Sequence, residues 1–459
     1  MKPIRLSAFL LAVLMLLPLL ASCGHTYSFG FLRPDTTATE ANDPAGTDPT
    51  EKDSGTAASG EAREYLARAL NTVDYNTGGE RLTDPDFLAR LSAFSGRLYE
   101  MCAAEQTGNY VLSPVSVWFA LAILNAIGDE GVHRDVEKLT GMTQEDLALA
   151  GRFFLGLSQE TSVEGTPVSR LTLTDSIWID SGVTASRPVL DRLAEELYCY
   201  AHEAPFASDN RSANQALRDF VREKTNGLID QDFDLQPDTL FALVNTLYLK
   251  DVWNLEGGTL YEKDAKFRGA DGTVTVPFLT GYYYPGEAME NDLCRYCYTK
   301  TACGYRMIFL LPKDGHTLAE VMTGANLEAV NATTDYRRDP GDGKTHYTRC
   351  IFPTFRLESE TQMDEILPAN GYLENAFRSF YTELTDEELC ISEILHRAVL
   401  KVDKDGVEGA AVTIIAIKAT SAGPDDSIVY HDFEVNRSFG FLLTDPTGAV
   451  LFAGQVTTP

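Results

Sequence analysis

Residues 240–253 read LFALVNTLYLKDVW, and this stretch sets the fold class of the chain. From Leu240 to Leu249 the side chains are almost continuously apolar. Such a run predicts a strand that is covered on both faces inside a layered fold.

Shorter runs on either side predict the other elements. Helices are expected from Asp84 to about Met101, with a first-turn proline at Pro85, and over 114–127 and 212–229. The helix at 114–127 is apolar nearly all round, so it must lie in the core. Strands are expected at 171–179, where the pattern alternates, and at 274–279, 307–311, 398–402, 439–443 and 450–453. Helices dominate early and strands late, which predicts one large α+β domain.

The N-terminus has the layout of a secretory signal, with Lys2 and Arg5 before the apolar run 6–20 and small residues after it. Leu20, Ala21, Ser22 and Cys23 closely resemble the bacterial lipoprotein signal, in which the Cys is acylated. An ordinary signal with a chance Cys is the alternative. We expect a signal peptide over 1–22 and an exported protein. A lipid on Cys23 would hold it at a membrane face, on the cell surface or in the periplasm.

The segment after Cys23 has the composition of a tether. Residues 36–60, TTATEANDPAGTDPTEKDSGTAASG, are almost free of large apolar side chains, so burial cannot offset their ordering entropy. A flexible linker is expected over 23–60 and a folded domain over 61–459, with its core from about residue 84.

The charge balance excludes some partners. The chain has 38 Lys plus Arg against 67 Asp plus Glu, a formal net charge of -29. This charge opposes binding to nucleic acid and to anionic lipid, and it favours solubility or a cationic partner. We expect a monomer without a cofactor.

The cysteines do not form an obvious framework. Apart from Cys23 they are odd in number and scattered, which argues against a disulfide scaffold. Cys294 and Cys297 form CxxC with Cys303 nearby, a spacing that can hold zinc or exchange disulfides. No second pair completes four ligands, so buried structural thiols are the preferred interpretation and no metal site is predicted.

Enzymatic motifs are missing from the sequence. It contains no GxSxG, no HExxH and no glycine-rich phosphate loop after a strand. Nothing therefore favours an enzyme, and no catalytic residue is proposed.

An ordered set of motifs over residues 84 to 459 resembles the serpin family. Asn109, Ser113, Pro114 and Ser116 resemble its opening motif, and Val244, Asn245, Tyr248, Leu249, Lys250 and Trp253 its central strand. Further matches follow in order: Thr225, Gly227 and Ile229; Tyr305 to Pro312; Pro353, Phe355 and Leu357; Gly371, Ala376 and Phe377; Ile391 to Asp403; and Phe439 to Phe441 with Leu451, Phe452 and Gly454.

The resemblance implies a serpin fold, with three β-sheets, about nine helices and an exposed C-terminal reactive-centre loop at about 404–432. A target protease cleaves this loop, and the acylated enzyme is carried along as the loop inserts into the main sheet. The resemblance assigns Ser113, Ser116, Asn245 and His396 to a polar shutter beneath that sheet. It places Trp253 under the point of first insertion, where plain core packing is the alternative.

The hinge of the loop corresponds to Gly406, Val407, Glu408, Gly409, Ala410, Ala411, Val412 and Thr413. It departs from the family pattern in Lys404 for Glu and Val407 for Thr. If Val407 points inward in the inserted strand, every second side chain from Val407 to Ala419 is buried, and none of these is charged. Glu408 and Lys418 lie at the alternate positions, which point outward. No proline interrupts the segment between Gly406 and Ala422. Without the resemblance, such a run of small residues would read as a hairpin strand.

The family register places the scissile bond between Thr420 and Ser421, with Lys418 and Ala419 as the alternatives. Small residues suit elastase-like or subtilisin-like serine proteases, whereas Lys418 suits trypsin-like ones, and a cysteine protease is a further option. A non-inhibitory binding or structural protein with the same fold is the rival hypothesis, motivated by Lys404, Val407 and a loop several residues longer than usual.

Overall fold

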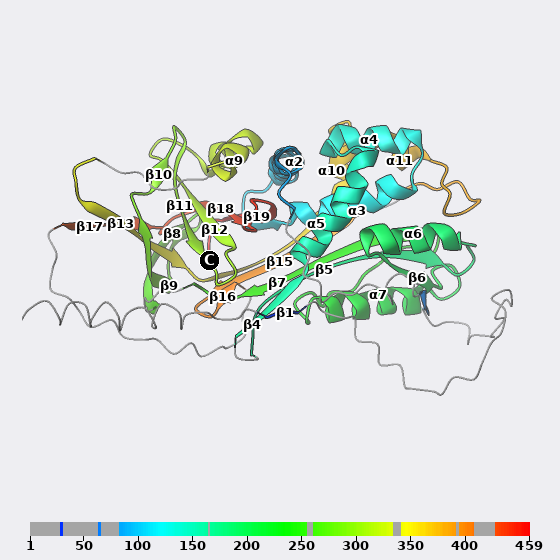
Figure 1. Cartoon of the computed structure of the whole chain (residues 1–459), viewed down its shortest axis with the longest axis horizontal. Coiled ribbons are helices and arrows are strands. Elements are labelled where there is room, and N and C mark those ends of the chain that lie inside the picture. The colour runs from blue at the N-terminus through cyan, green and yellow to red at the C-terminus, as the bar shows by residue number, and fades with distance from the viewer. Residues whose placement is uncertain are drawn as a thin grey trace, which may run out of the picture.

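The computed structural model describes residues 28–30, 63–65, 82–163, 166–254, 260–333, 341–391, 394–407 and 427–459 (Figure 1). The predicted signal peptide, lipidated Cys23 and most of the linker lie outside these ranges. So do Glu408 to Thr413 of the hinge and the candidate cleavage residues Lys418, Ala419, Thr420 and Ser421. Within the described residues, no helix has the length and hydropathy required to cross a bilayer.

The largest sheet has nine strands and contains the apolar run that opened the sequence. Its path is β1 (Ser28–Gly30), β4 (Gln159–Val163), β5 (Thr166–Asp180), β7 (Phe241–Asp251), β16 (Gly406–Val407), β15 (Leu395–Asp403) and β14 (Phe355–Gln362). Beside this path, β6 (Tyr200–Ala204) pairs with β5 and with β2 (Arg63–Tyr65). The predicted central strand is β7, which pairs with β5 along its whole length.

Two smaller sheets complete the β-structure. The six-stranded sheet has the order β10 (Met289–Glu290), β11 (Cys294–Lys300), β12 (Arg306–Pro312), β18 (Phe439–Thr444), β19 (Val450–Val456) and β3 (Tyr110–Leu112). The four-stranded sheet has the order β17 (Ile428–Glu434), β13 (Thr345–Pro353), β9 (Gly272–Pro285) and β8 (Tyr261–Gly269). The expected three-sheet α+β fold is confirmed.

Helices pack on both faces of β7, which explains its continuous apolar run. In Figure 1, α3 (Pro114–Ile127) lies on one side of β5 and β7 and α7 (Asn210–Lys224) on the other. Nearly every residue of α3 is buried, as its all-round apolar sequence predicts. The remaining helices are α2 (Pro85–Ala103), α4 (Glu130–Thr140), α5 (Leu147–Leu157), α6 (Arg187–Leu197), α8 (Leu318–Val321), α9 (Gly324–Asn331), α10 (Met363–Ala369) and α11 (Glu374–Arg378).

Local interactions decide where two of the predicted helices begin or end. Helix α2 begins where expected, because the Asp84 carboxylate accepts a hydrogen bond from the Phe87 amide at 2.8 Å. Helix α7 ends at Lys224, five residues before the predicted end at Ile229. Asn226 and Gly227 have φ values of 53° and 75°, so the backbone turns left-handed there and the helix cannot continue.

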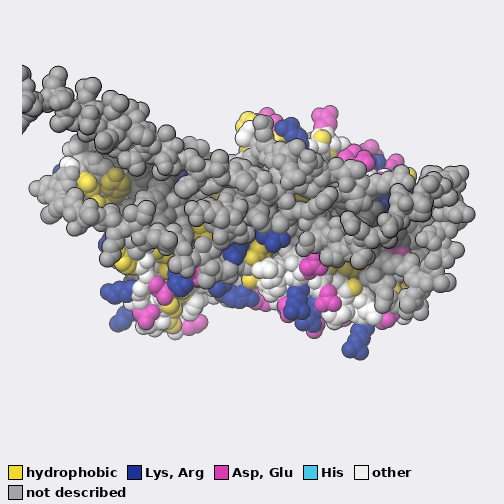
Figure 2. All heavy atoms as spheres, turned by 60° about the horizontal axis from the view of Figure 1, so that its bottom comes forward, with side chains coloured by type: hydrophobic (Ala, Val, Ile, Leu, Met, Phe, Trp, Pro, Cys, Tyr) yellow, Lys and Arg dark blue, Asp and Glu magenta, His cyan; other side chains and the backbone are white. Residues whose placement is uncertain are grey.

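The surface charge is mixed on the face shown in Figure 2. Acidic and basic side chains of the described residues alternate there, with no continuous basic area among them. This part of the surface therefore offers no electrostatic track for a nucleic acid.

Candidate functional site

The two described residues of the predicted hinge form β16, a short strand wedged into the largest sheet. Val407 pairs antiparallel with Val402 of β15 and with Asp251 of β7, and Gly406 pairs with Asp403. Its position between β7 and β15 makes β16 the element that joins the two halves of the sheet.

Gly406 is required at this position. Its φ is +144°, and a Cβ placed on it would lie 2.0 Å from the carbonyl oxygen of Asp251. Both the backbone conformation and the close approach exclude a larger residue.

Trp253 lies beside this junction and fixes it. Its indole Nε1 donates a 2.7 Å hydrogen bond to the carbonyl oxygen of Asp403, and its buried ring packs edge-on against Phe352 at 5.5 Å. The same side chain therefore contributes to core packing and positions the turn that leads into β16.

The neighbouring Asp251, beside β16 on strand β7, has a buried carboxyl group. Burial raises its pKa to about 7, although hydrogen bonds that include one from the Cys303 amide at 3.0 Å act in the opposite direction. The junction thus contains a carboxyl group that is protonated much more readily than a surface aspartate.

The two departures from the family pattern have structural explanations. Lys404 lies in the turn between β15 and β16, where its ammonium is more than half exposed and pairs with Asp405 at 2.8 Å. Val407 is fully buried with its side chain inward, which is the orientation expected from strand parity. Lys404 therefore adds no buried charge, and Val407 adds apolar burial.

Beyond β16, the facing edges of β7 and β15 have no strand partner among the described residues. In this part of the chain, Asp251 is the only residue of β7 that pairs with β16. Val402 and Asp403 are the only residues of β15 that do so. A cavity of about 120 Å³ lies between them, lined by both strands and by α3 and α7; its wall includes Ser116, Asn245 and His396.

Three of the four predicted shutter residues meet at the start of α3. The Ser113 amide donates to Nε2 of His396 at 3.1 Å, and the Ser113 hydroxyl donates to the Ser116 hydroxyl at 3.2 Å. Burial lowers the pKa of His396 to about 4, so the ring is neutral near pH 7 and Nε2 accepts. These contacts tie α3 to β15.

Asn245, the fourth predicted residue, binds a different partner, directly opposite it on the neighbouring strand β5. Its side-chain amide donates to Asp175 of β5. Burial raises the pKa of Asp175 to about 7, and the hydrogen bond from Asn245 opposes this shift. Neither Asp175 Oδ2 nor Asn245 Oδ1 has another partner in the described structure.

Asp175 is a site residue that sequence reasoning missed. It occupies the inward parity of β5, between Leu173 and Ile177, which are both buried. The alternation of 171–179 contained this signal, because a carboxylate on the apolar parity of a strand must be paired or protonated.

The thiols of the CxxC pair do not form a common site. Cys294 and Cys297 are both buried on β11, and a spacing of three residues places them on opposite faces of the strand. Burial raises the pKa of Cys294, which disfavours the thiolate required for zinc binding or disulfide exchange. This geometry supports the interpretation of structural thiols.

The raised pKa of Asp175 predicts a pH-dependent stability. Because its pKa is about 7 in the folded state against an ordinary value of 3.8, folding favours the protonated acid. This contribution is full below pH 4 and is lost as the pH rises through 7. Replacement by the neutral isostere in Asp175→Asn should raise the thermal midpoint at pH 8 relative to wild type by a few degrees, and should raise it by a smaller amount at pH 5.

The measurement is the thermal midpoint of both proteins, followed by circular dichroism from pH 5 to 8. His396 and Asp251 are present in both proteins, so their own titration cancels in the comparison. Parallel profiles for the two proteins would show that Asp175 is not protonated in the folded state.

Comparisons with known proteins agree with this architecture. The family model described as Serpin (serine protease inhibitor) matches residues 89–459. Serpin A3-1 from Bos taurus is 28% identical over 393 residues, covering 80% of this chain and 87% of the relative. An uncharacterized serpin-like protein of Thermococcus kodakarensis is 26% identical over 396 residues, covering 85% of this chain and 89% of the relative.

Solved structures show the same fold. The native state of tengpin, a thermophilic serpin, has a TM-score of 0.69 at 24% identity and covers 87% of this chain and 100% of its own. Thyroxine-binding globulin in complex with thyroxine has a TM-score of 0.65 at 20% identity, covering 82% of this chain and 99% of its own. Because the family model spans most of the sequence, the chain belongs to the serpin family.

Proposed function

We propose that this protein inhibits a serine-type protease as a suicide substrate, by loop cleavage followed by insertion of the loop into the nine-stranded sheet. The observation that carries the proposal is the pair of edges on β7 and β15 that have no strand partner within the described part of the chain and face the same cavity below β16. A strand with unpaired amides and carbonyls accepts another strand readily.

The register of β16 specifies how the hinge would insert. Val407 lies opposite Val402 and Asp251, so continuation of the same antiparallel ladder places Gly409 between Leu400 and Leu249. Ala411 then lies between Ala398 and Leu247. The four flanking side chains are buried, and the hinge supplies small residues at the matching positions. The inserted strand therefore fits without a charge in the core.

Thr413 is the next inward residue in this register, and it arrives between His396 and Asn245. Both line the cavity, and Asn245 Oδ1 has no hydrogen-bond partner among the described residues. A hydroxyl arriving here supplies a donor to a polar cluster that already binds α3 and β5. The shutter residues thus lie where the hinge meets them.

The outward residue Glu408 also finds suitable neighbours. The same register places it between Lys250 of β7 and Lys401 of β15, which are both partly exposed. The charge nearest the point of insertion is therefore opposed by two cations at the sheet surface. The exposed pair adds at most about 1 kcal/mol, so it guides the register more than it stabilises the sheet.

Insertion has a large driving force. Each inserted residue gains backbone hydrogen bonds to one or both flanking strands, at about 1 kcal/mol net per bond. An intact loop is held at its far end by β17, so only cleavage releases it to insert fully. This accounts for coupling between proteolysis and the structural change.

The protease-trapping assay tests this mechanism. The purified protein is incubated with elastase, subtilisin and trypsin, and the products are separated under denaturing conditions. We expect a denaturant-resistant complex with an elastase-like or subtilisin-like enzyme, from cleavage at Thr420–Ser421, or with a trypsin-like enzyme if Lys418 is used. Loop cleavage by all three enzymes without a trapped complex would refute inhibition.

Charge parity in the hinge gives a sharper test. Ala411→Arg places a cation between Leu247 and Ala398 in the inserted strand, so the variant should be cleaved as a substrate and lose most of its complex formation. Glu408→Gln changes a side chain that points outward in the inserted strand. It serves as the matched control and should retain trapping. Equal trapping by both variants would contradict the proposed register.

Gly406 gives a prediction at the junction itself. A Cβ in Gly406→Ala would meet the Asp251 carbonyl at 2.0 Å, so β16 should leave the sheet, with slower insertion and a smaller fraction of trapped protease. Gly108→Ala is the control, because no atom lies within 4 Å of its added Cβ. Complex yield and loop cleavage are measured together, and a yield equal to that of the control would reject the role of the glycine.

A non-inhibitory binding protein is the second candidate. The long loop and Val407 motivate it, and the thyroxine complex of thyroxine-binding globulin shows that a protein of this fold can hold a small molecule. On this hypothesis, loop cleavage leaves the thermal midpoint nearly unchanged. A large increase after cleavage supports insertion instead.

We further propose export as a lipoprotein at a bacterial surface or in the periplasm, with residues 1–22 removed and Cys23 acylated. The signal-like sequence that ends at Cys23 supports this location. In bacterial cells, Cys23→Ser should abolish acyl labelling and shift the protein from the membrane fraction to the soluble fraction. Unlabelled wild-type protein would favour an ordinary signal.

A further inference from the structure

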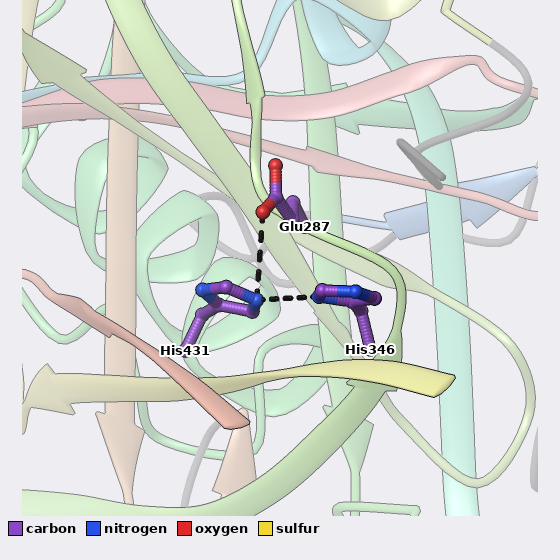
Figure 3. A group of neighbouring side chains, drawn as sticks. All are labelled: Glu287, His346 and His431. Carbon is purple, nitrogen blue, oxygen red and sulfur yellow. Dashed lines mark hydrogen bonds and ion pairs between the residues drawn. The ribbon is translucent and has the colours of Figure 1, made fainter. Parts of the chain in front are cut away.

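Glu287, His346 and His431 converge on one point of the four-stranded sheet. Glu287 lies just after β9, His346 lies on β13 and His431 lies on β17, and Figure 3 shows their side chains pointing toward one another. His346 Nδ1 lies 2.8 Å from His431 Nε2, which is 3.5 Å from Glu287 Oε1. The candidate ligand atoms all lie within 4.8 Å of one another.

Asp342 determines which nitrogen of His346 faces the cluster. Its carboxylate lies 2.9 Å from His346 Nε2, so that nitrogen carries the proton and donates it. The lone pair of Nδ1 then points at His431, and the proton of His431 Nε2 occupies the space between the rings. A cation that replaces this one proton can bind His346 Nδ1, His431 Nε2 and the Glu287 carboxylate.

The backbone holds Glu287 in place. The amide of Gly286 donates to the His346 carbonyl at 2.8 Å, and the Thr348 hydroxyl donates to the Gly286 carbonyl at 2.7 Å. Both bonds attach the loop after β9 to β13. The carboxylate is therefore presented by a constrained segment and not by a free loop end.

We propose that Glu287, His346 and His431 form a binding site for a divalent transition-metal ion, with Zn²⁺ as the best fit. Two imidazoles and one carboxylate are ligands that Zn²⁺ accepts, and a water molecule completes four-coordination. The Asp342–His346 pair is the carboxylate–imidazole arrangement that orients metal-bound histidines.

The geometry requires only a small adjustment. Zn–N bonds of about 2.1 Å at a tetrahedral angle separate two ligand atoms by roughly 3.4 Å. The His431–Glu287 separation already matches this value, and the two rings must move apart by about half an ångström. His346 Nδ1 and the Glu287 carboxylate, which lie within 4.8 Å of each other, must approach to the same separation. His431 is one-third exposed, so an ion can enter from solvent.

The site would secure the strand that follows the proposed reactive loop. Strand β17 lies at the edge of its sheet and pairs only with β13 among the described strands. A metal bound to His431 adds a second attachment, to the segment after β9. This inference concerns a separate site, and it stands whether or not the protein inhibits a protease.

Zinc titration calorimetry on the EDTA-treated, reduced protein tests the proposal. We expect one Zn²⁺ per chain and a higher thermal midpoint in its presence. His431→Ala and Glu287→Gln should each lower the affinity at least tenfold, and Asp342→Asn roughly tenfold. His316→Ala is the matched control, because His316 faces Glu320 at 3.8 Å without a third ligand.

Two further measurements locate the ion. Co²⁺ substitution should give a visible spectrum without thiolate charge transfer, and Cys390→Ser should bind as wild type does, because that exposed thiol is not a ligand. Amide exchange over Ile428–Glu434 should slow with Zn²⁺. No binding, or equal affinity in the His431 and Glu287 variants that remain folded without metal, would overturn the proposal.

Discussion

Two strands in the middle of the largest sheet, β7 and β15, present their hydrogen-bonding edges to the same space, and among the described residues only Gly406 and Val407 join them. This constraint governs the rest of the molecule. A buried strand edge without a partner is costly, because its amides and carbonyls lose water and gain no replacement. In the described residues the sheet is therefore complete at the Asp251 end and incomplete toward His396, where the proposed insertion of the hinge would complete it.

The polar cluster at the incomplete end fits this constraint. An apolar interface there would pack α3, β7 and β15 together and fill the cavity. Instead, α3 is tied to β15 by the Ser113–His396 bond, and β7 to β5 by the Asn245–Asp175 bond. Each strand keeps its own polar partner on its own side. Neither of these two bonds crosses from β7 to β15, so the strands can separate here without breaking either one. The Trp253–Asp403 bond does cross, at the β16 end of the sheet.

The other end of the segment is anchored in a different way. The reactive loop proposed here connects β16, inside the nine-stranded sheet, to β17, at the edge of the four-stranded one. Strand β17 is attached to β13 by a parallel ladder and by the ion pair between Arg349 and Asp432, with a 2.6 Å contact. In the proposed mechanism, the attachments at β16 and at β17 together set how far the loop enters the sheet before it is cut.

The sequence determined the elements whose causes are local. The apolar run Leu240–Leu249 predicted a strand covered on both faces, and the Asp84 cap predicted the start of α2. Shutter residues Ser113, Ser116, Asn245 and His396 were found by resemblance, since each is an ordinary residue within its own segment. Only the tertiary structure paired Asn245 with Asp175 and brought Glu287, His346 and His431 together. Those contacts join residues on separate strands, and sheet pairing sets their distances, which no spacing along the chain encodes.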